Sequence, residues 1–205
     1  MDNRQIRERY DKRAAIYDAT MGRGESKLTG DFRARFGAML RGQTLEIAIG
    51  SGLNLPYYSA RVTRAFGVDL SRGMLDVAAR RARDLHLPIG LAVMDAQQLA
   101  FPERTFDTVA ISLGLCTVPD PVAALREVSR VCKPDGQIML LEHVRSPVLP
   151  VALLQRLLSP IQERINGCHL ARETTVIARA FGLEIVQEDR RLLGIVRLVV
   201  ARPTI

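Results

Sequence analysis

The 205-residue chain contains only three cysteines, and their positions exclude the usual cysteine frameworks. Cys116, Cys132 and Cys168 are odd in number, widely separated and without a CxxC pair. Such a set resembles neither a disulfide scaffold nor a zinc-ligand motif. We therefore expect reduced cysteines, an intracellular protein and no bound metal.

Long hydrophobic runs and targeting signals are also missing. No run approaches the roughly 18 apolar residues of a membrane span, and the opening stretch, MDNRQIRERYDKR, is too charged for a signal peptide. There is no internal repeat and no low-complexity tract. With 47% hydrophobic residues, the sequence predicts one globular domain over residues 1–205. We expect it in the cytoplasm, with at most a peripheral position at the inner face of a membrane.

Lysine is scarce, so arginine carries nearly all the positive charge of this +7 chain. Only Lys12, Lys27 and Lys133 are lysines. A basic protein suits an anionic partner such as a membrane surface or a nucleic acid. The arginines are spread along the chain without an aromatic-interleaved basic patch, so we expect no nucleic-acid partner.

The chain does contain an alternation of apolar, strand-like runs and amphipathic, helix-like stretches. This alternation is typical of a parallel sheet with helices on both faces. Strands are expected at 44–49, 62–68, 89–94, 105–113, 137–143, 183–189 and 194–201. Helices are expected at 5–17, 27–40, 72–84, 121–132 and 172–180. Because a tight turn joins the last two strands, the prediction is a Rossmann-like, seven-stranded, mostly parallel α/β sheet with a terminal antiparallel hairpin.

A glycine-containing turn, Gly50-Ser51-Gly52, ends the first predicted strand. Glycine lets the backbone approach a ligand closely. The second strand ends in Asp69, whose carboxylate can accept hydrogen bonds from the hydroxyls of a ribose. A dinucleotide site would need a third glycine at the start of a helix, but Leu-Asn-Leu-Pro follows instead. The pattern favours S-adenosylmethionine (SAM), which has an amino-acid tail in place of a pyrophosphate.

Ordered motifs between about residues 45 and 144 resemble those of class I SAM-dependent methyltransferases. TLEIAIGSG is similar to the first motif, D/E-x-G-x-G-x-G, with Ala48 in place of the first glycine. GVDLSRGMLDVA resembles the second motif, VMDAQQLAFPERTFDTVAIS the third and fourth, and ALREVSRVCKPDGQIMLLEHV the stretch that follows. The resemblance implies a methyltransferase that uses SAM, forms S-adenosylhomocysteine and needs no metal.

The same resemblance implies which residues hold the cofactor. Asp69 would bind the ribose hydroxyls, while Asp95 and Ala96 would contact the adenine. The full expected set is Tyr17, Glu46, Ala48, Gly50, Gly52, Asn54, Asp69, Leu70, Met74, Asp95, Ala96, Gln97 and Ser112.

Methyl transfer needs a general base only where the acceptor must lose a proton. The donor already carries its leaving group, so the protein mainly orients the reactants. The catalytic candidates are His143 and Glu142, at the carboxyl end of the fifth predicted strand, and His169. Ligands bind at that end of such sheets, and histidine titrates near neutrality.

Two resemblances bear on the acceptor. RYDKRAAIYDATMG resembles the N-terminal helix of ubiquinone/menaquinone C-methyltransferases and bacterial phospholipid N-methyltransferases. Residues 1–42 are therefore expected to form lid helices, with Tyr10 and Tyr17 helping to close the site. The segment that begins LGLCTVPDP, together with NGCHLARET, is similar to a branch that methylates alkyl thiols. We favour a phospholipid amine; a quinone, a thiol or another small molecule are the alternatives.

Residues 147–170 form an apolar insertion that we expect to line or cover the acceptor site. Helical spacing places several apolar side chains on one face, namely Val151, Leu154, Leu158, Ile161 and Ile165. Three arginines flank them, Arg145, Arg156 and Arg164. Contact with an anionic membrane, a wall of the acceptor pocket and a contact between subunits are the open alternatives.

Overall fold

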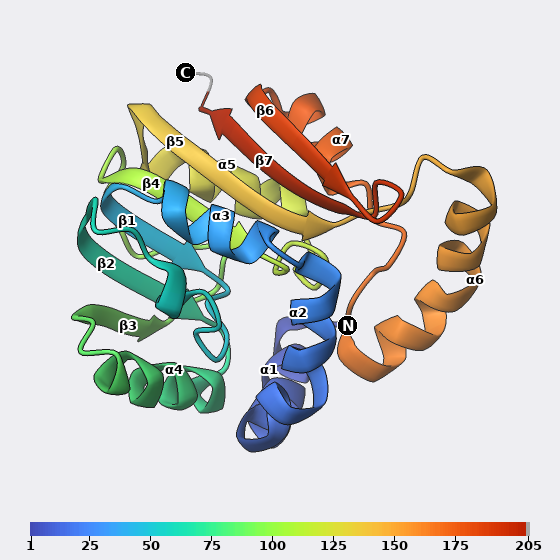
Figure 1. The fold of residues 1–205 in the computed structure, drawn as a ribbon, viewed down its shortest axis with the longest axis horizontal. Helices are drawn as coiled ribbons and strands as arrows, with labels where there is room; N and C mark the ends of the chain where they lie inside the picture. The colour runs from blue at the N-terminus through green and yellow to red at the C-terminus, as the bar shows by residue number, and fades with distance from the viewer. Residues whose placement is uncertain (204–205) are drawn as a thin grey trace.

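One seven-stranded sheet organises the protein (Figure 1). The computed structural model describes residues 1–203, apart from the side chain of Asn166. The strand order is β3-β2-β1-β4-β5-β7-β6. The bounds are β1 Gly42–Ile47, β2 Val62–Asp69, β3 Ile89–Val93, β4 Phe106–Ser112, β5 Cys132–His143, β6 Glu184–Arg191 and β7 Val196–Arg202. Strands β1 to β5 run parallel, whereas β7 pairs antiparallel with both β5 and β6. The predicted fold class and its terminal hairpin are confirmed.

Helices pack on both faces of the sheet. On one face, α3 (Phe32–Met39) packs Phe32 and Phe36 against β5 and β7. On the other, α5 (Pro121–Val131) and α7 (Thr174–Phe181) contribute Leu125 and Ala178 to the largest core cluster. α4 (Arg72–Asp84) lies against β2 and β3. Ser71 caps α4 by accepting a hydrogen bond from the backbone amide of Met74 at 3.1 Å.

The central strands of the sheet are buried on both faces. In β4, Val109 and Ile111 enter the core beneath α5 and α7, and Ala110 enters the core beneath α3. Successive strand residues point to opposite faces, so a central strand covered by helices must be apolar throughout. β5 begins earlier than predicted, at Cys132, because Phe106 of β4 already pairs with Cys132 there.

The N-terminal segment differs from the two long helices predicted at 5–17 and 27–40. α1 (Asn3–Arg13) leads into a 3-10 turn, a π-helical turn at Asp18–Gly22 and α2 (Arg23–Thr29). Gly30 then separates α2 from α3 with a φ of +56°. Glycine has no Cβ that could clash at a positive φ, and a residue in this conformation ends a helix. The amphipathic pattern of the sequence continues through Gly30, so hydrophobic periodicity alone did not predict the break between the two helices.

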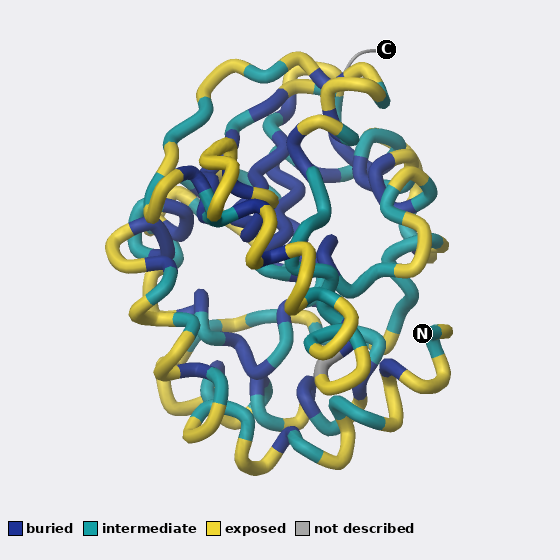
Figure 2. The backbone as a smooth tube through the Cα atoms, turned by 90° about the vertical axis from the view of Figure 1, so that its right-hand side faces the viewer, coloured by how far each residue is buried: buried dark blue, intermediate teal, exposed yellow. Residues whose placement is uncertain are grey.

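The apolar insertion forms α6 (Leu149–Asn166), which lies away from the sheet and beside the N-terminal helices (Figure 1). Guanidinium groups of α1 bind its last turn: Arg9 donates to the Arg164 carbonyl, and Arg13 donates to the Ile165 carbonyl at 3.1 Å. Exposed residues predominate along α6, which faces the viewer in Figure 2. Among the helices of residues 1–203, none has the length and apolarity needed to cross a membrane.

Candidate active site

A cavity lies at the carboxyl ends of the parallel strands. The turn after β1, Asp69 at the end of β2 and Asp95 after β3 all line it. Residues of the N-terminal segment, including Ile6 and Tyr10, complete the wall. The loops that follow parallel strands converge at this edge, which is where such sheets bind ligands.

Most of the residues predicted to hold the cofactor meet in this cavity. Eleven of the thirteen line it: Tyr17, Glu46, Ala48, Gly50, Asn54, Asp69, Leu70, Met74, Asp95, Ala96 and Ser112. Gly52 instead shapes the turn, with a φ of +77° and no room for a Cβ, which would lie 2.7 Å from Leu55. Gln97 supports Asp95, since its backbone amide donates to Asp95 Oδ1 at 2.9 Å.

The glycine turn keeps its geometry despite the alanine in its motif. Ala48 has a φ of +54°, in the left-handed region, which costs an alanine on the order of 1 kcal/mol. Gly50 follows with a φ of +58°. Asp69 holds the turn in place, because its Oδ2 accepts from the Gly50 amide at 2.9 Å and its Oδ1 accepts from the Ser71 amide at 2.9 Å.

A buried polar network crosses the floor of this cavity. The Glu46 carboxylate accepts hydrogen bonds from the Tyr58 hydroxyl at 2.5 Å and from the Asn54 amide. Arg33 donates through Nη1 to Asn54 Oδ1 at 2.5 Å, and its Nη2 lies 3.2 Å from Glu25 Oε2. Arg33 Nε is buried with no hydrogen-bond partner in the described part of the chain. A guanidinium with a remaining donor beside the glycine turn fits the carboxylate of the SAM amino-acid tail.

Glu46 makes folding stability depend on pH. Burial raises the pKa of its carboxyl to about 7, and the hydrogen bonds from Tyr58 and Asn54 only partly oppose this shift. In an unfolded chain the same carboxyl titrates near 4.3. The folded state therefore binds the proton more tightly. The resulting stabilisation is complete below the unfolded pKa and is lost as the pH rises through 7.

Glu46→Gln should flatten this dependence, because glutamine keeps the shape of the side chain but cannot ionise. Between pH 5 and pH 8 we expect the wild type to lose about 2–3 kcal/mol more unfolding free energy than the variant. Urea denaturation at each pH measures the difference, and the exposed Glu184→Gln serves as the matched control. Parallel stability profiles for wild type and Glu46→Gln would contradict the assignment.

A second cavity, of about 360 Å³, adjoins the first. Five residues line both cavities: Tyr10, Tyr17, Glu25, Leu113 and Thr117. Much of the remaining surface is apolar, with Met21, Leu28, Leu170 and Ile195, while α1 adds Arg9 and Arg13 and α6 adds Gln155 and Gln162. The two cavities therefore share a wall, which places a methyl donor in the first next to an acceptor in the second.

The N-terminal tyrosines stand at the junction of the two cavities. The Tyr10 and Tyr17 rings lie 6.1 Å apart, centroid to centroid. The Tyr17 hydroxyl donates to the carboxylate of Glu25. Glu25 is a residue that sequence reasoning missed, since nothing in its local pattern distinguishes it from a solvated helix glutamate.

The three predicted catalytic residues occupy different environments. His143, at the end of β5, lines the second cavity. Glu142 lines neither cavity and instead fixes the loop after β4, because its Oε1 accepts from the Gly114 amide at 2.9 Å. His169 lines neither cavity, and its Nδ1 lies 3.5 Å from Glu163 of α6. Of these three residues, the structure brings His143 alone into the site.

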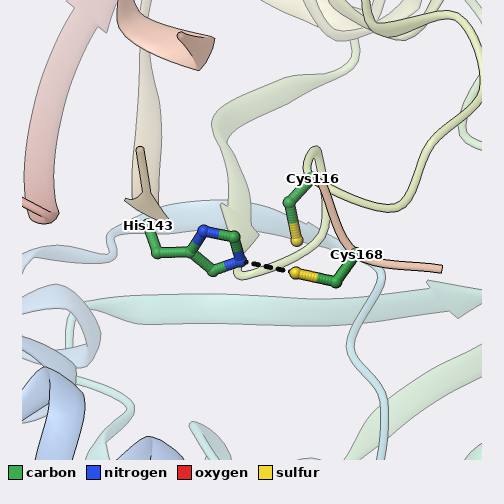
Figure 3. A group of neighbouring side chains, drawn as sticks. All are labelled: Cys116, His143 and Cys168. Carbon is green, nitrogen blue, oxygen red and sulfur yellow. Dashed lines mark hydrogen bonds between the residues drawn. The ribbon is translucent and has the colours of Figure 1, made fainter. Parts of the chain in front are cut away.

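Two of the scattered cysteines lie beside His143 (Figure 3). Cys116 follows β4, and Cys168 follows α6. The Cys168 sulfur lies 3.0 Å from His143 Nε2, and the two sulfurs and one ring nitrogen lie within 4.8 Å of one another. Hydrogen bonding from Cys116 and His143 lowers the pKa of the Cys168 thiol. Sequence spacing gave no sign of this cluster.

Comparison with known proteins agrees with the geometry. Residues 45–140 match the family described as "Methyltransferase domain". Phosphatidylethanolamine N-methyltransferase of Cereibacter sphaeroides is 34% identical over 186 residues, 88% of this chain and 84% of that protein. Thiol S-methyltransferase TMT1B of Rattus norvegicus is 34% identical over 134 residues, 63% of this chain and 55% of that protein.

The solved structure of the DhpI–SAH complex shares the fold, with a TM-score of 0.75 at 22% identity over 98% of this chain and 96% of that one. The Cereibacter relative matches along most of both chains, and the ordered motifs converge on one cavity. The chain therefore belongs to the class I SAM-dependent methyltransferases and is an enzyme that takes its methyl group from SAM.

Proposed function

We propose that the enzyme methylates the amine of a lipid-like acceptor, of phosphatidylethanolamine type, at a membrane surface. One observation carries this proposal: the largely apolar second cavity meets the cofactor cavity at a carboxylate, Glu25. Glu25 is the only acidic residue among the described residues that line the second cavity. An apolar cavity suits acyl chains, and a carboxylate on the wall shared with the cofactor cavity suits a cationic head group. The name of the Cereibacter relative supports the same class of acceptor.

Glu25 is placed to receive the ammonium group and its proton. The carboxylate is held by Arg33 Nη2 at 3.2 Å and by the Tyr17 hydroxyl. Burial raises the pKa of Glu25, which moves it toward that of an ammonium and favours proton transfer. The deprotonated amine then presents its lone pair at the junction. SAM supplies a methyl group on a sulfonium, which keeps the electrons of the broken bond. His143 lines the second cavity but not the cofactor cavity, so we assign the role of base to Glu25 and not to His143.

The outer face of α6 is suited to a membrane interface. We define the α6 apolar face as seven side chains that are between 42% and 73% exposed: Leu149, Leu153, Leu154, Leu157, Leu158, Ile161 and Ile165. A contiguous apolar surface of this kind marks an interaction site. The flanking arginines at 145, 156 and 164 are exposed and complement anionic phospholipids. The other side of the helix contributes Gln155 and Gln162 to the second cavity, so docking brings that cavity to the lipid.

Leu157→Asp should weaken membrane binding. Leu157 is 73% exposed at the centre of the α6 apolar face, and burying one leucine contributes about 1.5–3 kcal/mol. We expect at least a tenfold lower partition onto vesicles of phosphatidylethanolamine and phosphatidylglycerol, measured by flotation. Leu85→Asp, at an exposed leucine after α4, is the control. Equal partition of Leu157→Asp and wild type would exclude docking through this face.

Labelled methyl transfer from SAM into a cell extract tests the acceptor. We expect label in the organic phase, in a product that co-migrates with N-methylated phospholipid. Label confined to the aqueous phase would exclude a lipid acceptor. Label in a quinone or in a volatile methyl thioether would replace the amine with one of the two alternative acceptors.

A further inference from the structure

We propose that Cys116, His143 and Cys168 bind one thiophilic divalent metal ion, best matched by zinc, with a fourth coordination position open to the second cavity. The three residues come from the loop after β4, the end of β5 and the segment after α6, and their side chains point toward one another (Figure 3). All three line the second cavity. This binding does not depend on which acceptor the enzyme methylates.

The separations of the three potential ligand atoms suit a tetrahedral ion. Zinc binds sulfur at about 2.3 Å and imidazole nitrogen at about 2.0–2.1 Å, so neighbouring ligand atoms lie about 3.6–3.8 Å apart. Here the Cys168 sulfur and His143 Nε2 are 3.0 Å apart, and none of the three separations exceeds 4.8 Å. Small side-chain adjustments bring the set to the zinc geometry.

The backbone already holds the two cysteine segments together. The His169 amide donates to the Cys116 carbonyl at 3.1 Å. Arg172 donates through Nη1 to the carbonyls of Leu115 at 2.5 Å and Val118 at 2.6 Å. A ligand set that is fixed before the ion arrives loses little conformational entropy on binding. The guanidinium of Arg172 also stabilises thiolates nearby.

The charge and softness of the set select the class of metal. Two thiolates and a neutral imidazole neutralise a divalent cation, so the complex is compatible with a buried apolar wall. Thiolate and imidazole ligands favour zinc over magnesium or calcium, which prefer oxygen. Three protein ligands with one position left for solvent or substrate is the arrangement of catalytic zinc sites, whereas structural sites have four protein ligands.

Metal titration of the cofactor-free protein tests the proposal. The full chain is kept under a phosphine reductant, freed of metal, and titrated with Zn²⁺ against a chromophoric chelator. We expect one equivalent per chain. Cys116→Ser, Cys168→Ser and His143→Asn should each weaken binding at least 100-fold. Cys132→Ser should bind as the wild type does, because Cys132 lies at the start of β5, outside the cluster.

Cobalt reports the coordination directly. Co²⁺ should produce thiolate charge-transfer absorption in the wild type and in Cys132→Ser but not in a Cys116→Ser/Cys168→Ser variant. Added ethanethiol should shift the visible Co²⁺ bands if the fourth position is open. Binding of S-adenosylhomocysteine by every variant shows that it is folded.

Three results would overturn the proposal: no stoichiometric Zn²⁺ binding by the reduced wild type, equal affinity in the folded cluster variants, or Co²⁺ bands indifferent to ethanethiol. The first two would leave Cys168 and His143 as a hydrogen-bonded pair without a metal. The third would make the site structural. None of these results would alter the identification of the methylated product in the labelling experiment, so the two proposals fail separately.

Discussion

Replacing Asp69 with alanine is expected to weaken binding of S-adenosylhomocysteine at least 100-fold. A carboxylate that accepts from both ribose hydroxyls makes two charge-assisted hydrogen bonds, each contributing about 1.5–3 kcal/mol. Loss of both exceeds the roughly 2.8 kcal/mol that corresponds to 100-fold. Asp69 also holds the Gly50 and Ser71 amides, so the glycine turn loses its support at the same time.

Titration calorimetry of Asp69→Ala against wild type measures this loss. Asp76→Ala is the matched control, because Asp76 is an exposed aspartate on α4 that pairs with Arg72 at 3.0 Å and lies outside both cavities. Circular dichroism of both variants checks that the fold is retained. An unchanged affinity in folded Asp69→Ala would show that the ribose binds elsewhere.

Glu25→Gln is expected to lower kcat/KM for an amine acceptor by about 100- to 1000-fold, within the range of about 10²–10⁴-fold that proton transfer to a positioned side chain contributes. The variant keeps the size of the side chain, and its amide oxygen can still accept from Arg33 while its NH2 group donates to the Tyr17 hydroxyl oxygen, so the affinity for S-adenosylhomocysteine should stay within tenfold. The wild-type rate should rise with pH as Glu25 ionises, and this limb should be missing in the variant.

Glu173→Gln is the control for Glu25→Gln, because Glu173 pairs with Arg145 at 2.8 Å on the surface and lines neither cavity. Steady-state rates with mixed micelles containing phosphatidylethanolamine give kcat and KM separately. If Glu25→Gln impaired cofactor binding and left kcat unchanged, Glu25 would belong to the cofactor site and the proposed head-group contact would be wrong.

Much of the cofactor cavity could be predicted because its residues lie at the ends of successive strands. Gly50 lies in the turn after β1, Asp69 is the last residue of β2 and Asp95 follows β3, and the parallel topology brings these positions to one edge of the sheet. The local sequence pattern was therefore enough to predict that these residues lie together. Even Ala48, which stands where the motif has glycine, adopts a left-handed backbone.

The acceptor side was harder to predict, because it depends on how distant segments pack. Glu25 and Arg33 enter the site only because the N-terminal segment breaks at Gly30 and folds over the sheet. Periodicity correctly placed one apolar face on α6. It could not decide whether that face points inward, and the structure turns Gln155 inward and Leu157 outward.

The sequence by itself determined the fold class, the methyl donor and most of the cofactor cavity, because short-range spacing encodes strand ends and turns. Cys116 and Cys168 are widely separated in the sequence, which argued against a disulfide scaffold or a zinc-ligand motif. They are neighbours of His143 only in the tertiary structure. Their meeting depends on the packing of the loop after β4 against the segment after α6, held by Arg172. Contacts between segments so far apart leave no periodic trace in the chain, so only the folded structure could reveal them.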